Sequence, residues 1–178
     1  MEKMIIGLIS DTHINDKSYK LTENLKTAFK DVDLILHAGD IVIPRVLDEL
    51  EKIAPVIAVQ GNMDRANGFD LPERKLIEKK GVKIGLIHGE VYPKGDDQQL
   101  YYLAKELEAD ILVSGHTHQP MIETVKDVLL LNPGSPTAPR LADPSVMLLK
   151  INDGEVDVEP LKVGAPVCSA LNMDQFKK

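Results

Sequence analysis

The stretch that decides the fold spans residues 4–13 and reads MIIGLISDTH. Its first six residues are apolar except for one glycine, which is typical of a short strand buried on both faces. Asp11 and His13 follow at once, where the chain has to leave the strand. The sequence therefore predicts a buried first strand whose end carries residue types that bind metals.

The same pattern recurs along the chain. Further apolar runs, each followed by polar residues of ligand type, are residues 34–36 before His37, Gly39 and Asp40, residues 55–59 before Gly61, Asn62 and Asp64, residues 82–87 before His88 and Gly89, and residues 111–113 before Gly115, His116 and His118. The carboxyl ends of parallel strands share one edge of a sheet, so these side chains can converge although they are far apart in sequence. We therefore expect a single site at the strand ends.

The arrangement of the remaining apolar residues indicates the fold class. Apolar residues recur at helical spacing in residues 21–29, 46–53 and 100–107, between the expected strands. After His118 the pattern changes to short strands at residues 121–125, 128–131, 146–151 and 156–161, with a hairpin turn at 152–154, so that this half is expected to be antiparallel. An α/β part followed by a β-rich part favours two packed sheets flanked by helices over one open sheet.

Length and composition indicate one compact domain. The chain has 178 residues, of which 43% are hydrophobic, so it can bury a sizeable core. We place this domain at residues 1–163 and treat residues 164–178 as a C-terminal extension of unclear role. The formal net charge of -7, without a cluster of Lys and Arg, disfavours binding to long nucleic acid or to an anionic membrane.

The cysteine count and the hydropathy suggest a location. Cys168 is the single cysteine, which excludes an internal disulfide and favours a reducing compartment, most simply the cytoplasm. No apolar stretch approaches the roughly 20 residues that a membrane-spanning helix needs. We therefore expect a soluble protein without a membrane partner, and the sequence leaves a homo-oligomer open.

Seven side chains in the turns are candidate metal ligands: Asp11, His13, Asp40, Asn62, His88, His116 and His118. Imidazole, carboxylate and amide donors without a thiolate suit a catalytic site for Zn, Fe, Ni or Mn. Seven donors are too many for one open catalytic ion, but they suit two ions that share a carboxylate.

Each candidate, taken alone, has a simpler interpretation. His88 could be a hydrogen-bonded residue at a strand end, and Asp40 and Asn62 could be turn residues. Four of the five histidines, however, lie in these turns, and the fifth, His37, lies three residues before Asp40. The conjunction favours a metal site.

The ordered motifs Asp11-Thr12-His13, Gly39-Asp40, Gly61-Asn62, His88-Gly89 and Gly115-His116-Thr117-His118 resemble those of the calcineurin-like metallophosphoesterase superfamily. The small size and the Asn132-Pro133-Gly134-Ser135 stretch are similar to its stand-alone microbial phosphodiesterases. The resemblance implies a four-layer α/β/β/α sandwich. It also implies that one ion is held by Asp11, His13 and His118, the other by Asn62, His88 and His116, with Asp40 bridging and His37 supporting the ligands from behind.

The resemblance implies a dinuclear-metal phosphoesterase, and specifically a phosphodiesterase that cleaves small phosphodiesters by attack of a hydroxide bridging the two ions. Asp40 and Asn62 would be the catalytic residues, with Asn62 also orienting the phosphate. The cofactors would be two divalent transition-metal ions, with Mn or Ni favoured and Fe or Zn open.

One position departs from the family pattern. Many relatives carry a His after the Asn of the third motif, where it assists the leaving group, whereas this chain has Met63. A thioether cannot donate a proton, and the neighbouring Asp64 could equally be a turn or supporting residue, so the general acid is unassigned. We expect diesters with good leaving groups to be better substrates than alkyl monoesters.

Several alternatives stay open. The enzyme could be a phosphomonoesterase acting on small metabolites or a nuclease, although the lack of a basic track disfavours the latter. The chain could also be a non-enzymatic scaffold, as is the retromer subunit that shares this fold. Pro133, Gly134, Ser135 and Arg140 could line a phosphate pocket or form an ordinary loop.

Overall fold

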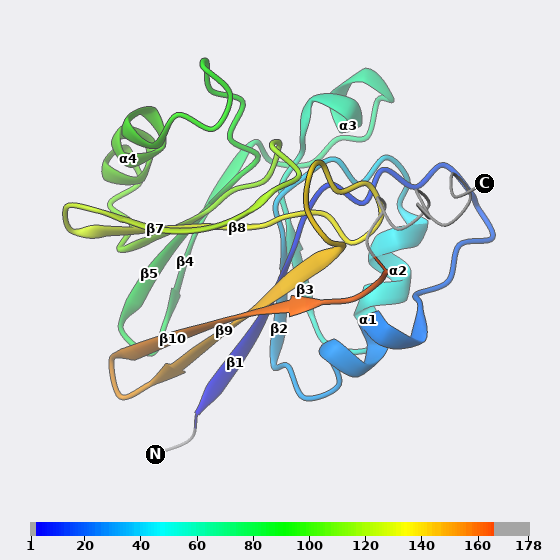
Figure 1. Cartoon of the computed structure of the whole chain (residues 1–178), viewed down its shortest axis with the longest axis horizontal. Helices are drawn as coiled ribbons and strands as arrows, with labels where there is room; N and C mark the ends of the chain where they lie inside the picture. The colour runs from blue at the N-terminus through cyan, green and yellow to red at the C-terminus, as the bar shows by residue number, and fades with distance from the viewer. Residues whose placement is uncertain (1–2, 166–178) are drawn as a thin grey trace, which may run out of the picture.

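The computed structural model describes residues 3–165, which form two mixed sheets with helices on their outer faces (Figure 1). In chain order the elements are β1 (Met4–Ile9), α1 (Glu23–Ala28), β2 (Leu34–His37), α2 (Arg45–Glu51), β3 (Val56–Ala58), α3 (Asn62–Ala66), β4 (Arg74–Lys79), β5 (Val82–Ile87), α4 (Asp97–Glu106), β6 (Ile111–Val113), β7 (Pro120–Val125), β8 (Val128–Pro133), β9 (Ser145–Asn152) and β10 (Glu155–Lys162).

Both sheets are mixed: the first has antiparallel pairs on one side only, and the second has an antiparallel pair at each edge. The first sheet has the order β10-β9-β1-β2-β3, in which β1, β2 and β3 are parallel and β9 and β10 are antiparallel. The second has the order β4-β5-β6-β8-β7, in which β5, β6 and β8 are parallel. The carboxyl ends of β1, β2, β3, β5 and β6 therefore define the edge at which a site can assemble.

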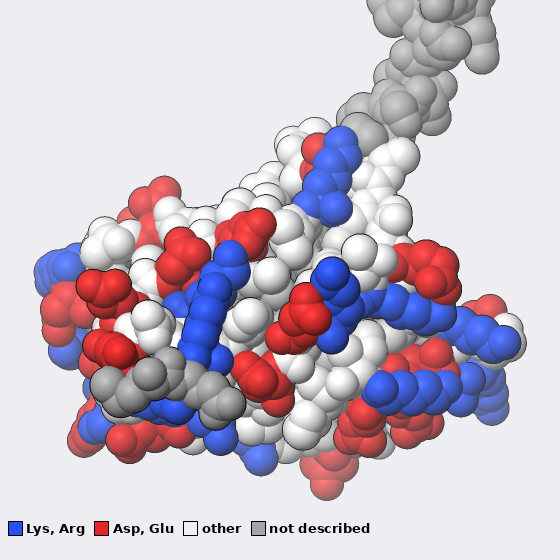
Figure 2. All heavy atoms as spheres, turned by 90° about the horizontal axis from the view of Figure 1, so that it is seen from below, with Lys and Arg blue, Asp and Glu red and all other residues white. Residues whose placement is uncertain are grey.

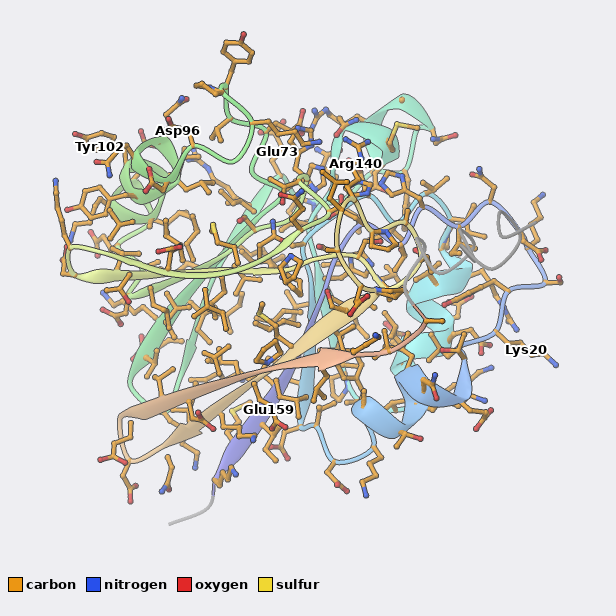
Figure 3. All side chains as sticks on the ribbon, viewed as in Figure 1. Lys20, Glu73, Asp96, Tyr102, Arg140 and Glu159 are labelled. Atoms are coloured by element: carbon orange, nitrogen blue, oxygen red, sulfur yellow. The ribbon has the colours of Figure 1, made fainter. Side chains whose placement is uncertain are left out.

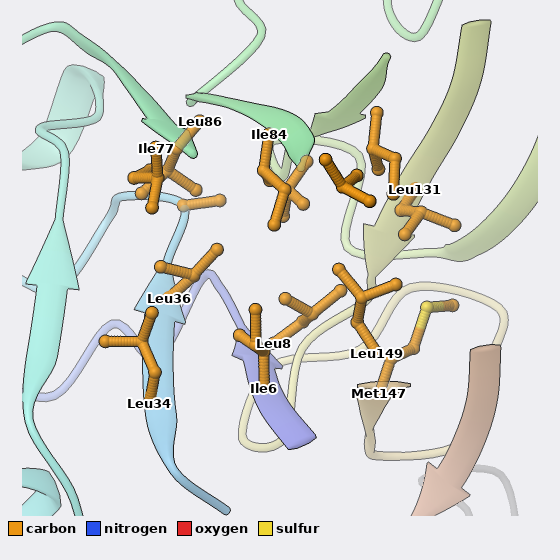
Figure 4. Packing of buried hydrophobic residues seen from close by; sticks show 14 of the residues in the cluster. Ile6, Leu8, Leu34, Leu36, Ile77, Ile84, Leu86, Leu131, Met147 and Leu149 are labelled. Atoms are coloured by element: carbon orange, nitrogen blue, oxygen red, sulfur yellow. The ribbon is translucent and has the colours of Figure 1, made fainter. Parts of the chain in front are cut away.

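The main core lies between the two sheets (Figure 4). Ile6 and Leu8 of β1 pack in one cluster with Ile84 and Leu86 of β5, and all four side chains are fully buried. Burying one such side chain contributes about 1.5–3 kcal/mol, so this layer supplies much of the driving force for folding.

Helices cover the outer faces and complete four layers. Phe29 after α1 and Leu50 of α2 pack on Ile9 and Ile35 of the first sheet. Leu100, Tyr101 and Ala104 of α4 pack on Leu112 and Leu130 of the second. The predicted α/β/β/α sandwich is confirmed, and so is the prediction that residues 4–9 form a strand buried on both faces.

Two elements were not predicted, and one pairing differs from expectation. β4 is an edge strand with a single buried residue, Ile77, and its charged side chains conceal it in the hydropathy pattern. α3 is only five residues long and follows Gly61 without an apolar stripe. The half after His118 is not wholly antiparallel, because β8 pairs with β6 in parallel.

The predicted hairpin turn is present between β9 and β10, where Asp153 and Gly154 have φ values of 49° and 82°. Such left-handed pairs match the twist of a two-residue hairpin. Most of the expected extension, residues 166–178, and with it Cys168, lies outside the described residues. Within residues 3–165, no helix is long and apolar enough to cross a membrane.

Candidate metal centre

Six of the seven predicted ligands lie in the loops that follow strands, and Asn62 is the first residue of α3, which follows β3. The first sheet carries four of them and the second sheet three. After β1 come Asp11 and His13, after β2 Asp40, after β3 Asn62, after β5 His88, and after β6 His116 and His118. The structure thus brings residues more than a hundred positions apart to one place.

Most of the ligand loops have an unusual backbone. Asp11, His13, Asp40, His116 and His118 all have φ values between 46° and 70°, in the left-handed region. A residue other than glycine pays roughly 1–2 kcal/mol for this conformation, so the surrounding structure must hold it. Backbone hydrogen bonds from Asp11 to Gly39 and from His13 to Asp40, of 2.9 and 3.0 Å, tie the first two loops together.

One group of donor atoms consists of Asp11, His13 and His118. The Nε2 atoms of His13 and His118 are 3.1 Å apart, and Oδ1 of Asp11 lies 3.3 Å from Nε2 of His118. Bonds from a metal ion to imidazole nitrogen are about 2.0–2.1 Å long, so both nitrogens can reach the same ion.

A second group overlaps the first and includes Asp11, Asp40 and His88. Oδ2 of Asp40 lies 3.4 Å from Nε2 of His88 and equally 3.4 Å from Nε2 of His13. Nδ1 of His116 lies 3.3 Å from Nε2 of His88. The carboxylate of Asp40 therefore stands between the histidines of the two sheets.

Hydrogen bonds on the far side of the ligands fix which atom faces the centre. Nδ1 of His88 donates to the carbonyl of Ala38 at 2.7 Å, and Nδ1 of His118 donates to that of Ala138 at 2.6 Å. Each bond leaves an Nε2 lone pair directed at the cluster. The carboxylates are held in the same way, since Asp11 Oδ2 accepts from the His116 amide and Asp40 Oδ1 from that of Met63.

Two buried oxygens in this cluster lack a hydrogen-bond partner among the described residues: Oδ1 of Asp11 and Oδ1 of Asn62. An unpaired buried acceptor costs roughly 1–3 kcal/mol, and more when it is charged. Both belong to predicted ligands, and hard oxygen donors of this kind suit a divalent cation. The residues present therefore fit a metal centre.

The electrostatics favour positive charge at this place. Burial by itself raises the pKa of Asp11 and of Asp40, but nearby histidines outweigh it and hold both pKa values below the usual range. Burial lowers the pKa of His88, but Asp40 and Asp11 raise it by more than burial lowers it, so that the net shift is upward. Burial lowers the pKa of His116 and His118, which favours the neutral form that a metal ligand needs.

His37 is fully buried behind the ligands. Its Nδ1 accepts from the Gly39 amide and its Nε2 lies 3.2 Å from the Thr12 hydroxyl, to which it donates. Burial, partly offset by Asp11, lowers the pKa of His37 to about 3. It is therefore a neutral residue that joins the Asp11 and Asp40 loops, as expected of a supporting histidine.

Asp64 is also a supporting residue. Its buried carboxylate accepts hydrogen bonds from the backbone amides of Ile41, Val42 and Gly61 at 2.7–2.9 Å. These contacts fasten the loop of Asp40 to the start of α3, where Asn62 lies. Of the two interpretations that the sequence left open, the supporting role fits, because all three bonds require a carboxylate that acts as an acceptor.

The stretch Asn132 to Ser135 also supports the site from inside. The Ser135 hydroxyl, fully buried, donates to the Asp11 carbonyl at 2.7 Å, and Asn132 Nδ2 donates to the Gly115 carbonyl at 2.8 Å. A phosphate-binding role for Ser135 is therefore not supported by its contacts. Arg140 differs, because its side chain is exposed, in the upper half of Figure 3.

Sequence reasoning missed three charged residues beside the centre. Arg65 of α3 forms a two-fold ion pair with Glu90 at 2.6 and 2.7 Å, which joins the loops of Asn62 and His88. Lys94 lies in the loop between β5 and α4, where burial lowers its pKa and the charges of Asp11 and Asp40 oppose that shift. None of the three belongs to a motif, and only their nearness in sequence to Asn62 and His88 could have pointed to them.

Fold and site together define a metallophosphoesterase. A family model described as the calcineurin-like phosphoesterase superfamily domain matches residues 4–154, and the chain belongs to that superfamily. Its members generally use divalent metals, and the activity type is that of a phosphoester hydrolase.

Individual proteins agree with this assignment. A probable metallophosphoesterase of Methanothermobacter thermautotrophicus is 58% identical over 169 residues, which is 95% of this chain and 98% of that protein. The crystal structure of wild-type Vps29 of Entamoeba histolytica complexed with Zn is 30% identical, with a TM-score of 0.71 over 90% of this chain and 100% of that one. The structure of an archaeal phosphodiesterase is 26% identical, with a TM-score of 0.66 over 89% and 100%.

Proposed function

We propose that residues 1–163 form a dinuclear-metal phosphodiesterase that hydrolyses small phosphodiesters. The observation that carries the proposal is the placement of Asp40, whose Oδ2 lies 3.4 Å from one histidine of each sheet. A carboxylate in this position can serve two ions at once. The similarity to an archaeal phosphodiesterase supports the choice of a diester.

The ligands would divide as the family resemblance implies. Asp11, His13 and His118 would hold one ion, Asn62, His88 and His116 would hold the other, and both would share Asp40. Nitrogen and oxygen donors favour Mn or Ni, with Fe and Zn as alternatives, and the Vps29 relative was crystallised with Zn. Two such ions would supply a bound water with a pKa near neutrality and would offset charge on the phosphoryl oxygens.

The chain's own residues position the substrate but do not protonate the leaving group. Asn62 is half-buried and offers its amide to a phosphate oxygen as well as to an ion. Met63 lacks a proton to donate, and Asp64 is occupied by three backbone amides. Substrates must therefore carry leaving groups that depart without an acid, which favours activated diesters over alkyl monoesters.

The first test compares turnover of bis-p-nitrophenyl phosphate and of an alkyl phosphate such as glycerol phosphate, with Mn or Ni added. We expect the diester to be cleaved at least about 100-fold faster, since general acid catalysis contributes roughly 10²–10⁴-fold where it exists. Faster cleavage of the alkyl monoester would contradict the proposal and favour a phosphomonoesterase of small metabolites.

The charge and the cysteine content of the chain suit a small substrate and a cytoplasmic location. On the face opposite the site, Lys and Arg are interspersed with Asp and Glu (Figure 2), and the net charge is -7, so long nucleic acid is not an expected partner. A single cysteine suits a reducing compartment.

A non-enzymatic scaffold is the second candidate, and the likeness to Vps29, named for vacuolar protein sorting, favours it. Metal binding alone does not separate the two candidates, because that relative was crystallised with Zn. Turnover does: a metal-loaded protein that cleaves no phosphoester in the test above would support the scaffold.

A further inference from the structure

Val42, two residues after Asp40, has a backbone conformation that its own side chain disfavours. Its φ is 81°, and among residues 3–165 it is the only β-branched residue with a positive φ. A branched Cβ crowds the backbone in this region, so the conformation is strained and surrounding contacts must hold it. The strain lies in the loop that presents the candidate bridging carboxylate.

The side chain of Asp64 supplies the contacts that hold Val42. Its Oδ1 accepts hydrogen bonds from the Val42 amide at 2.7 Å and from the Ile41 amide at 2.9 Å. Its Oδ2 accepts from the Gly61 amide at 2.8 Å. Asp64 is fully buried, and a buried carboxylate is stable only where its oxygens are well hydrogen-bonded. The carboxylate and the strained loop therefore stabilise each other.

The position of the Asp40 carboxylate depends on these contacts. Oδ1 of Asp40 accepts from the Met63 amide at 2.8 Å, and an added Cβ at Gly61 would lie 2.1 Å from the same oxygen. Asp64 ties residues 41–42, directly after Asp40, to Gly61. A shift of this segment away from Gly61 would move Oδ2 of Asp40, which lies 3.4 Å from one histidine of each sheet.

We propose that Asp64 is a positioning residue of the metal centre, which holds Val42 in the strained conformation that sets the Asp40 carboxylate between the two ions. The proposal rests on the two-ion centre of the proposed function. Asp64 acts through the loop and not on the ions or the substrate. The need for Asp64 therefore depends on residue 42, because a glycine there adopts a positive φ without strain.

A double-mutant cycle between positions 64 and 42 tests this dependence, and the affinity of the chelator-treated protein for Mn is the readout. Asp64→Asn keeps the shape of the side chain, but its single acceptor oxygen cannot serve both the 41–42 segment and Gly61. We expect a roughly 10- to 100-fold loss of Mn affinity in calorimetric titration, as is common when the partners that orient a ligand are lost.

Val42→Gly alone should keep the Mn affinity within about 2-fold of the wild type, because glycine takes the same φ without strain. Added to Asp64→Asn, it should recover at least about 5-fold of the lost affinity, the factor that corresponds to the strain of one left-handed residue. Should Asp64→Asn not fold, Asp64→Ser, whose hydroxyl keeps an acceptor, enters the same cycle. A double variant that binds Mn no better than the Asp64 variant would overturn the proposal.

Lys80→Gly is the matched control. Lys80 has a φ of 52° and is exposed between β4 and β5, at the opposite end of β5 from His88. A glycine there also relieves left-handed strain, but away from Asp40. Added to Asp64→Asn, it should leave the Mn affinity at the level of the single variant. Recovery equal to that given by Val42→Gly would show that Asp64 acts only through overall stability, and would overturn the proposal.

A spectroscopic measurement reports on the shared carboxylate and does not depend on turnover. Mn ions that share a carboxylate are magnetically coupled, and their electron paramagnetic resonance spectrum differs from that of isolated ions. At equal Mn loading, the wild type and the double variant should show the coupled spectrum, and Asp64→Asn should show mainly isolated ions. A coupled spectrum of equal strength in Asp64→Asn would contradict the positioning role. If the wild type binds Mn but cleaves no diester, the phosphodiesterase function fails, and the Mn affinities and spectra still decide the role of Asp64.

Discussion

Gly61 is required by space rather than by backbone conformation. Its φ of -104° is open to any residue, but an added Cβ would lie only 2.1 Å from Oδ1 of Asp40. A glycine before Asn62 therefore lets the Asp40 carboxylate approach the start of α3 closely. The carboxylate accepts from the Met63 amide at the same place, so the fit is tight on both sides.

Gly61→Ala should displace the Asp40 carboxylate and weaken binding of Mn. We expect a roughly 10- to 100-fold loss of metal affinity, as is common when the partners that orient a ligand are lost. Calorimetric titration with Mn measures this loss of metal affinity.

Gly68→Ala is the matched control. Gly68 has a φ of 70° and nothing within 4 Å of an added Cβ, so the substitution strains only the backbone. It should lower the free energy of unfolding by about 1 kcal/mol and leave the metal affinity unchanged. Equal metal affinities in the two variants would contradict the role given to Gly61.

At the level of single residues, the sequence predicted the candidate ligands and the supporting His37, but it left the role of Asp64 open. Asp11 and His88 stand out because they directly follow apolar runs. Asp64 looks like any turn residue, since its partners Ile41 and Val42 lie more than twenty positions away and meet it only in the folded chain. Lys94 carries no local signal for the same reason.

Among the elements, α3 and the loop after β5 are joined across the site by Arg65 and Glu90. The former carries Asn62 and the latter follows His88, the predicted ligands of one ion. Both charged side chains are about a third or more exposed, so the pair contributes only about 1 kcal/mol or less. The ion pair should therefore affect the alignment of Asn62 and His88 more than the free energy of unfolding.

Arg65→Glu and Glu90→Arg should each weaken binding of the second Mn ion by roughly 3- to 10-fold, because each places like charges opposite one another. The double swap should restore most of the affinity. Calorimetric titration of the four proteins provides the double-mutant cycle. Additive losses in the double swap would show that the pair does not position these loops.

Elements were predictable where burial leaves a clear pattern. β1 is a continuous apolar run and β5 is apolar except for Lys83, and both were predicted at their observed bounds. β4 faces solvent at the sheet edge, and α3 is a single short turn of helix, so tertiary contacts rather than local hydropathy define them. The parallel pairing of β8 with β6 depends on topology that periodicity does not encode.

For the whole molecule, the buried neutral His37 links stability to pH. Its pKa of about 3 lies far below the 6.5 of an unfolded chain. Between these values the unfolded chain binds a proton that the folded protein does not, so stability is complete above pH 6.5 and falls as the pH decreases. Asp11 and Asp40, with lowered pKa values, add a loss only as the pH falls below their ordinary value of 3.8.

Between pH 7 and pH 4.5, the metal-free wild-type protein should therefore lose about 2–3 kcal/mol more unfolding free energy than the metal-free His37→Gln variant. Urea unfolding with a chelator present gives the free energy of unfolding of both proteins. The slope of this free energy against pH is compared, because the variant starts from a lower stability. Parallel slopes would mean that His37 is protonated in the folded protein.

The central claim is that two ions, sharing Asp40, are needed for diester hydrolysis. The measurement is turnover of bis-p-nitrophenyl phosphate during titration of chelator-treated protein with Mn, with bound metal counted by mass spectrometry. We predict that activity appears as the second ion binds, reaching two per chain, and that Asp40→Asn loses both metal and more than about 100-fold of the activity. Asp70→Asn, at an exposed site, should behave like the wild type. Full turnover with one ion or none, or an Asp40→Asn protein with unchanged metal and rate, would contradict the account.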